Sequence, residues 1–348
     1  MFKKTLIALS ALLALVIPAA ASAASNTGAV VFSKSSKVGD EVKGGLFAVK
    51  DGRLNQLTED STDTEPNFSP DGRTIAFARG GDIYSVRPDG SGQRQLSSGP
   101  EIDSLPKIAP NGKYVVFERR GALGGSSSLY SVGATGGGLR ALTSGGNDRE
   151  VAFSPDGKAV VFVRTTAGAN PNDDIYSIRP TGSGLTRLTR TGGVDEFAPR
   201  FFAAGIVYSR GESSPGPAAY ADIYTMRPNG TKVKPQVAGV GSAYVEDVSP
   251  NGKLLIFRRD QGLWEKKIGN TKARKLSQLP DQSVTTSVFS SDGKRVAAFV
   301  SVEEQQQLVS INVETRRQTQ LASGHDFDEG EGTVLGPVMD WQPVPQRR

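Results

Sequence analysis

The amino-acid sequence predicts an all-β protein, a seven-bladed β-propeller of four-stranded antiparallel blades that is closed by pairing of its N- and C-terminal strands. Three observations lead to this prediction. A unit of roughly 40 to 48 residues recurs along the chain. Each unit contains four short strand-like segments separated by turn residues. The two ends of the chain carry different parts of one unit, so that together they make one more blade.

The unit is clearest from Phe68, in FSPDGRTIAFARGGDIYSVRPDGSGQRQL. In FSPDG the proline and the aspartate favour a turn, and Gly72 accepts the positive φ that the turn needs. A Gly-Gly pair and a later Pro-Asp-Gly supply two more turns. The first strand ends at Phe68, RTIAFAR alternates as a half-buried strand does, and DIYSVR and QRQLS follow as the third and fourth strands. One unit is therefore a four-stranded antiparallel meander.

Both halves of the unit recur along the chain. The FSPDG half appears six times, from Phe68, Ile108, Phe153, Phe201, Val248 and Phe289, and is degraded at Phe201. The DIYSV half appears seven times, from Gly45, Asp82, Ser128, Asp174, Asp222, Gly262 and Gln307. The first DIYSV segment has no FSPDG segment before it, so one blade lacks its inner strand at the N-terminal end.

The C-terminal segment GPVMDWQP matches that missing strand, because Trp341 takes the place of the phenylalanine in TEPNFSP. We predict that this strand lies beside the strands containing Val30 and Phe47. Circular closure of this kind leaves few unprotected sheet edges. The alternative is six blades with loose ends. A solenoid is not expected, since solenoids stack units between polar end caps and have no reason to divide one unit between the termini.

The N-terminal segment has the layout of a secretory signal peptide. Two lysines precede an apolar run at Leu6–Ile17, and Ala21–Ala23 forms an A-x-A cleavage site. A membrane anchor needs roughly 18 or more apolar residues, and Pro18 ends this run too early. We therefore predict a signal peptide at residues 1–23 and a single propeller domain at residues 24–348, secreted or periplasmic, with no transmembrane segment.

Composition excludes several classes of protein. The 348-residue chain is 37% hydrophobic and 22% charged, as globular proteins are. It has no cysteine, which rules out disulfides, a thiol nucleophile and the acylated cysteine of a lipoprotein anchor. The formal net charge of +5 includes two lysines of the predicted signal peptide, so no nucleic-acid partner is predicted.

The repeat FSPDG…IAF…DIYSVRPDGSGQRQL resembles that of the TolB-type β-propellers, which are related to the WD-repeat propellers. The resemblance spans residues from about 29 to 343. It implies an exported bacterial protein whose propeller binds other proteins. The N-terminal α/β domain of TolB is not expected here, because fewer than ten residues separate the predicted signal peptide from the first strand.

Signatures of catalysis are absent from the sequence. A prolyl oligopeptidase-type peptidase would need a G-x-S-x-G elbow, and the chain contains none. The single histidine, His325, is interpreted as a loop residue, and one histidine cannot build a His-ligated metal site. We therefore predict a protein that is not an enzyme.

Carboxylates recur just before the predicted inner strands. They are Asp63, Glu65, Asp103, Asp148, Glu150, Asp195, Glu196, Glu246 and Asp247, with Asp326 and Asp328 before the C-terminal strand. Because inner strands surround the propeller channel, these acids are predicted to converge at one channel mouth and to create a negative potential there. The ligand would be a basic peptide segment or a cation such as Ca²⁺. No D-x-D-x-D-G loop occurs, which makes calcium the weaker prediction. The alternative is that these acids hydrogen-bond the backbone of their own turns.

Two classes of function follow. The first is an exported, monomeric, non-catalytic scaffold that binds a protein or a peptidoglycan-associated partner in the cell envelope. The second is a polysaccharide lyase or hydrolase that uses acid pairs at the channel mouth. The lack of a catalytic histidine and of a second domain favours the scaffold.

Overall fold

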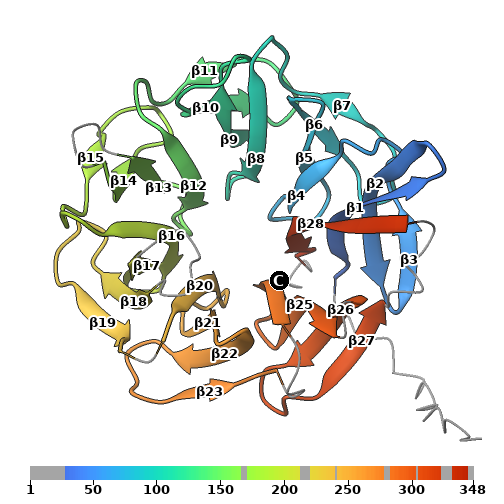
Figure 1. The fold of residues 1–348 in the computed structure, drawn as a ribbon. Helices are drawn as coiled ribbons and strands as arrows, with labels where there is room; N and C mark the ends of the chain where they lie inside the picture. Colours follow the sequence, from blue (N-terminus) through green and yellow to red (C-terminus); the bar gives the residue numbers. More distant parts are fainter. Residues whose placement is uncertain are drawn as a thin grey trace, which may run out of the picture.

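Seven four-stranded antiparallel sheets surround one central axis in the computed structural model of the protein (Figure 1). The structure describes residues 28–165, 171–211, 220–239, 241–277, 283–302, 305–322 and 331–343. Within these ranges all regular structure is β-strand, and no helix long and apolar enough to cross a membrane occurs. The predicted seven-bladed fold is confirmed, and the six-blade alternative is wrong. The predicted signal peptide, His325, Asp326 and Asp328 lie outside the described residues.

Each blade is numbered here by its order from the N-terminus, and its strands are given from the inner to the outer edge. Blade 1 contains β28 (Glu331–Trp341), β1 (Val30–Val38), β2 (Glu41–Lys50) and β3 (Arg53–Gln56). Blade 2 contains β4 (Thr64–Phe68), β5 (Ile75–Arg79), β6 (Asp82–Val86) and β7 (Arg94–Gln95). Blade 3 contains β8 (Ile102–Ile108), β9 (Tyr114–Arg120), β10 (Ser128–Gly133) and β11 (Arg140–Ala141). Blade 4 contains β12 (Asp148–Phe153), β13 (Val160–Thr165), β14 (Asp173–Ile178) and β15 (Thr186–Arg187).

The remaining three blades follow the same order. Blade 5 contains β16 (Asp195–Phe202), β17 (Gly205–Gly211), β18 (Ala221–Met226) and β19 (Lys234–Val237). Blade 6 contains β20 (Ala243–Val248), β21 (Leu254–Arg259), β22 (Gly262–Lys267) and β23 (Ala273–Lys275). Blade 7 contains β24 (Ser283–Phe289), β25 (Arg295–Val302), β26 (Gln305–Asn312) and β27 (Gln318–Ala322).

The two ends of the chain meet in blade 1, as the sequence predicts. Strand β28 pairs with β1 so that Trp341 lies opposite Val30, and β1 pairs with β2 so that Val30 also lies opposite Val49. The Trp341 indole N–H donates to the carbonyl of Gly28 at 3.0 Å. Trp341 is buried in one cluster with Phe32 of its own blade and Phe299 of blade 7. Closure therefore pairs the two ends of the chain within blade 1 and joins blade 1 to blade 7 through a shared hydrophobic cluster.

The core lies between neighbouring blades. The second strand of every blade contributes one fully buried aromatic ring at the same point of the repeat, namely Phe32, Phe77, Phe117, Phe162, Tyr208, Phe257 and Phe299. Phe77 of blade 2, for example, packs in one cluster with Val31 and Leu46 of blade 1. Burial of a side chain of this kind contributes roughly 1.5–3 kcal/mol. The alternation that predicts half-buried strands thus becomes a continuous inter-blade core.

The FSPDG turns form as expected and fix the orientation of the inner strands. In the first of them the Gly72 N–H donates to the Ser69 carbonyl at 2.8 Å, and Gly72 has a φ of 68°. The inner strands of blades 2, 3, 4, 6 and 7 each end at such a turn on one face of the disc, so they begin on the opposite face. We call that opposite face the entrance face, because the predicted site residues lie near it.

Candidate binding site around the propeller axis

Four inner strands carry a β-bulge at the same place, and the bulged residue has a positive φ. The angle is 58° at Glu65, 51° at Leu105, 60° at Glu150 and 50° at Ala198. Each of these residues falls where the register of the inner strand with its neighbour shifts. A bulge leaves one residue out of the ladder and redirects its backbone and side chain. In this protein the freed backbone N–H groups turn toward the preceding blade.

Carboxylates of the preceding blade accept these N–H groups. The N–H of Leu105 donates to Glu65 at 2.5 Å, and that of Ala198 donates to Glu150 at 2.5 Å. Blade 3 has Leu105 at the bulge and so lacks a carboxylate there. Glu118 on its second strand takes that place and accepts the N–H of Glu150 at 2.7 Å. Glu65, Glu118 and Glu150, called the axial glutamates below, thus link blades 2 to 5 in series.

A second set of inter-blade bonds lies nearer the FSPDG turns. The backbone N–H of Phe68 donates to Asp340 at 2.7 Å, and that of Phe289 donates to Asp247 at 2.9 Å. Asn67 plays the same part between blades 2 and 3, where its carbonyl oxygen accepts the N–H of Ile108 at 2.8 Å. Side-chain oxygens around the axis therefore fasten neighbouring inner strands to one another.

The acids at the start of the inner strands have a different role, because arginines neutralise them. The Arg79 guanidinium donates to both oxygens of Asp63, at 2.5 and 2.7 Å. Arg119 does the same to Asp103, at 2.6 and 2.7 Å. In each pair the aspartate side chain has no exposed surface. Such two-point pairs are geometrically specific and strong.

The same pairing continues in blades 4, 5 and 6. Arg164 donates to Asp148 at 2.5 and 2.7 Å, Arg210 to Glu196 at 2.9 Å, and Arg258 to Glu246 at 2.5 Å. Each of these five arginines also lies over one or two aromatic rings of its blade or its neighbour, and the Arg210 guanidinium carbon is 4.5 Å from the Tyr224 ring centre. Stacking and ion pairing together hold the guanidinium groups in place.

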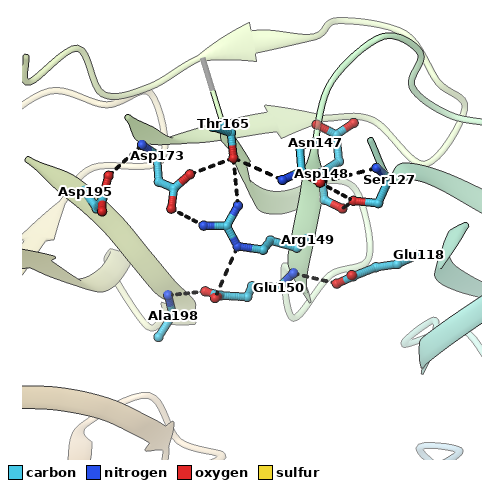
Figure 2. A network of polar contacts seen from close by, with 10 residues as sticks. All are labelled: Glu118, Ser127, Asn147, Asp148, Arg149, Glu150, Thr165, Asp173, Asp195 and Ala198. Carbon is cyan, nitrogen blue, oxygen red and sulfur yellow. Dashed lines mark hydrogen bonds and ion pairs between the residues drawn. The ribbon is translucent and has the colours of Figure 1, made fainter. Parts of the chain in front are cut away.

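A polar network on blades 3 to 5 joins the two kinds of acid (Figure 2). Arg149 donates to the Thr165 hydroxyl at 3.0 Å, forms an ion pair with Asp173, and lies 3.8 Å from the Glu150 carboxylate. Asp195 of blade 5 accepts the backbone N–H of Asp173 at 2.9 Å. The axial glutamates are thereby connected to the loops of the entrance face.

The structure thus sorts the predicted site residues into groups. The first group forms ion pairs with arginines and consists of Asp63, Asp103, Asp148, Glu196 and Glu246. The second group accepts backbone N–H groups of the next blade and consists of Glu65, Glu150 and Asp247. Glu246 belongs to both groups, because its second oxygen also accepts such an N–H group. Asp195 binds the backbone of blade 4, and Asp326 and Asp328 are not described. Sequence reasoning missed Glu118, Asp340 and the arginine partners. The arginines had a signal, since each follows its aspartate by 16 residues in blades 2, 3 and 4. Ligand binding by these acids stays a prediction.

Burial gives several of these carboxylates an unusually high pKa. Burial raises the pKa of Glu118 to about 7; the N–H of Glu150 opposes this, and the charges of Glu150 and Glu65 add to it. Burial likewise raises the pKa of Glu65, with the Leu105 N–H and the Lys107 charge acting against it. The charged forms of Glu65 and Glu118 are therefore incompletely compensated by the protein itself.

The described part of the chain contains no cluster of side chains that supports metal binding. There, no group of three or more His, Cys, Asp or Glu side chains is placed to hold a metal ion. The Ca²⁺ prediction stays untested, because Asp326 and Asp328 lie outside these ranges.

A surface pocket of about 520 Å³ opens on the entrance face beside the Arg79 pair, lined in part by Val42, Glu59 and Asp60.

Comparison with known proteins gives a family match and a large set of similar folds. Residues 25–188 match the TolB β-propeller domain family. TolB from Acinetobacter baumannii is 16% identical, with a TM-score of 0.55, over 90% of this chain and 82% of that chain. An oligogalacturonate lyase in complex with manganese is 12% identical, with a TM-score of 0.64, over 92% of this chain and 98% of that one.

A puromycin-hydrolysing peptidase from Mycobacterium tuberculosis has a TM-score of 0.64 at 12% identity, over 86% of this chain and 54% of that one. No curated protein gives a significant match. At these identities the solved structures establish the shared fold alone.

Proposed function

We propose that this TolB-type β-propeller repeat protein is an exported, non-catalytic scaffold whose axial glutamates bind a positively charged segment of a protein partner in the cell envelope. The family match over residues 25–188 and the similarity to TolB support a protein-binding role. The signal-peptide layout of residues 1–23 supports export.

One observation carries the proposal: three glutamates from adjacent blades are gathered near the axis, and the charges of two of them, Glu65 and Glu118, are undercompensated. Glu65 and Glu118 each use one oxygen to accept a backbone N–H, and in the described residues their other oxygen has no hydrogen bond. The pKa of both is raised by burial, and Glu65 and Glu150 raise that of Glu118 further. A lysine or arginine of a partner would supply the missing positive charge.

The ion-paired acids are less suited to this role. The carboxylates of Asp63, Asp103 and Asp148 have no exposed surface, and each is already held by an arginine. They stabilise the blades instead, and the binding role passes to the axial glutamates.

Affinity capture from an envelope extract tests the proposal, with residues 24–348 as bait. The bait variant Glu65→Gln/Glu118→Gln keeps both hydrogen-bond acceptors but removes both charges. A control bait, Glu59→Gln/Glu314→Gln, removes two exposed charges away from the axis. We expect one partner to be retained by the wild type and the control and lost by the axial variant. Equal capture by all three baits would place the binding surface elsewhere on the disc.

A second candidate function rests on Glu118. A pKa of about 7 suits a general acid or base at neutral pH, and an oligogalacturonate lyase shares the fold. The alternative is therefore a polysaccharide lyase or hydrolase in which Glu118 transfers a proton. Incubation of the wild type and Glu118→Gln with acidic and neutral polysaccharides, followed by detection of new chain ends, distinguishes this alternative from the scaffold.

A further inference from the structure

We propose that Lys107 and Arg200 form a binding site for a small oxyanion, a carboxylate or phosphate group, at the propeller axis. The site belongs to a ring of seven equivalent positions, each immediately before the residue that corresponds to Phe of FSPDG. The ring, called the lower ring, consists of Asn67, Lys107, Ala152, Arg200, Asp247, Val288 and Asp340. The proposal does not rest on the function proposed for the axial glutamates, although Lys107 interacts electrostatically with one of them, Glu65.

Charge is distributed unevenly around the lower ring. The inner strands contact one another in the order of the blades, so the ring order is also the spatial order. Lys107 on blade 3 and Arg200 on blade 5 flank Ala152 on blade 4, whose side chain ends at Cβ. Asp247 on blade 6 lies next to Arg200 in the ring, and Asp340 on blade 1 lies two positions from Lys107. The cationic part of the ring is therefore limited to blades 3 to 5, where a short side chain separates the two cations.

The two acids of the lower ring, Asp247 and Asp340, accept hydrogen bonds from backbone N–H groups. Asp340 accepts the N–H groups of Phe68 and Trp341, at 2.7 and 2.8 Å. Asp247 accepts the N–H groups of Phe289 and Val248, at 2.9 and 2.8 Å. Each carboxylate thus has a donor on both oxygens. These contacts fix the two acids against their own and the next inner strand, so that neither is free to swing toward the cations.

Most N–H donors of Lys107 and Arg200 are not used in hydrogen bonds within the described residues. Among the described residues, no carboxylate oxygen lies within 4 Å of the Lys107 ammonium or the Arg200 guanidinium. Arg200 donates one hydrogen bond, from Nη1 to the Pro199 carbonyl at 3.0 Å. An ammonium has three N–H donors and a guanidinium has five. Most of these donors therefore have no acceptor within the described part of the protein, although both side chains are half-buried.

Electrostatic coupling places the Lys107 ammonium near the axis. Burial lowers the pKa of Lys107; Asp340, Glu65 and Asp247 oppose this shift, and Arg200 adds to it. These partners come from blades 1, 2, 5 and 6, so Lys107 interacts electrostatically with groups across the axis. An oxyanion between Lys107 and Arg200 would relieve the repulsion between the two cations and accept their unused donors. Asp247 and Asp340 would limit the ligand to a small anionic group.

The test measures binding of inorganic phosphate and of acetate to residues 24–348 by calorimetry, at pH 7 and at ionic strength fixed with chloride. We expect saturable binding of at least one anion, weakened about tenfold or more in Arg200→Gln and in Lys107→Gln, as expected for loss of a charged hydrogen-bond donor. Lys158→Gln is the control, because its side chain is 84% exposed and its ammonium already has a partner in Asp156 at 3.5 Å. Circular dichroism and melting temperature verify that each variant is folded.

The relative affinities for phosphate and acetate show whether the natural ligand carries a phosphate group or a carboxylate. Tighter binding of phosphate identifies the former, and tighter binding of acetate the latter. The proposal is overturned if the folded wild type binds neither anion beyond the chloride background. It is also overturned if Arg200→Gln and Lys107→Gln bind as tightly as Lys158→Gln, since the ion would then sit elsewhere.

Discussion

Asp148 at the start of strand β12 lies directly opposite Arg164 in strand β13, and the arginine donates to both carboxylate oxygens at 2.5 and 2.7 Å. The same cross-strand relationship joins Asp103 to Arg119 in blade 3. In blade 4 the pair is also linked to blade 3, because the Thr143 hydroxyl donates to Asp148 and accepts the backbone N–H of Leu129. Asp148 thus connects β12 and β13 of blade 4 with β10 of blade 3 and with the loop between β11 and β12.

Replacement of Arg164 by methionine should therefore be strongly destabilising. The carboxylate of Asp148 has no exposed surface and would be left without its counter-charge. We expect a loss of about 3–5 kcal/mol in the free energy of unfolding, measured by denaturant titration. Lys158→Met is the matched control, since it removes an exposed cation whose ion pair is worth about 0–1 kcal/mol. If Arg164→Met loses no more than the control, the pair is not a structural element.

The closing strand gives a second prediction. Trp341→Ala should cost about 3–5 kcal/mol, because the indole is buried against Phe32 and Phe299 and donates to the Gly28 carbonyl. Deletion of all residues after Pro337 should expose an edge of β1 and cause aggregation. The control is Trp264→Ala, in a half-buried outer position, which should cost less. A truncated protein that melts like the intact one contradicts the shared-blade closure.

Glu118 makes stability depend on pH in a defined direction. Its pKa rises from 4.5 to about 7 on folding, so the folded state binds this proton more tightly than the unfolded state. The resulting stabilisation is fully present below about pH 4.5 and is lost as the pH rises through 7. Glu118→Gln should therefore be more stable than the wild type at pH 8 and similar to it at pH 4.5.

Thermal unfolding at several pH values measures this difference. Glu59→Gln, an exposed acid of the entrance face, is the control and should follow the wild type throughout. A constant difference between Glu118→Gln and the wild type from pH 4.5 to pH 8 would show that Glu118 does not titrate in this range.

Proton release gives a further prediction for the proposed partner. A cationic segment bound beside Glu118 should lower the pKa of that group from about 7 and release protons at pH 7. Calorimetry of a lysine-rich peptide in two buffers of different ionisation enthalpy measures the release. It should disappear in Glu118→Gln. Identical heats in both buffers for the wild type would mean that peptide binding does not change the protonation of Glu118.

The fold could be predicted from the sequence because turns and strand alternation recur in every unit. Gly72 shows the positive φ that the FSPDG turn requires, and Trp341 fills the place of the missing phenylalanine. Local chemistry decides these features, so that one unit contains all the necessary information. The side-chain partners are different, because they depend on register and on how neighbouring blades pack.

The Asp148–Arg164 pair was accessible in principle, since a hairpin of fixed length puts residues 16 apart opposite each other in blade after blade. The link from Glu118 to Glu150 was not. It exists because Leu105 at the neighbouring bulge offers no carboxylate, and because the bulge of blade 4 turns its N–H toward blade 3. Neither the bulge nor the distance between two blades can be read from one repeat.

Binding of a cationic peptide to the axial glutamates is the most direct test of the proposed function. We would titrate a labelled lysine-rich peptide into the wild type, Glu65→Gln/Glu118→Gln and the control Glu59→Gln/Glu314→Gln, at low salt and at about 0.15 M salt, where the Debye length is about 8 Å. The account predicts binding to the wild type and the control that weakens with salt, and a loss of about tenfold or more in the axial variant. Equal affinity of the axial variant and the wild type would contradict it.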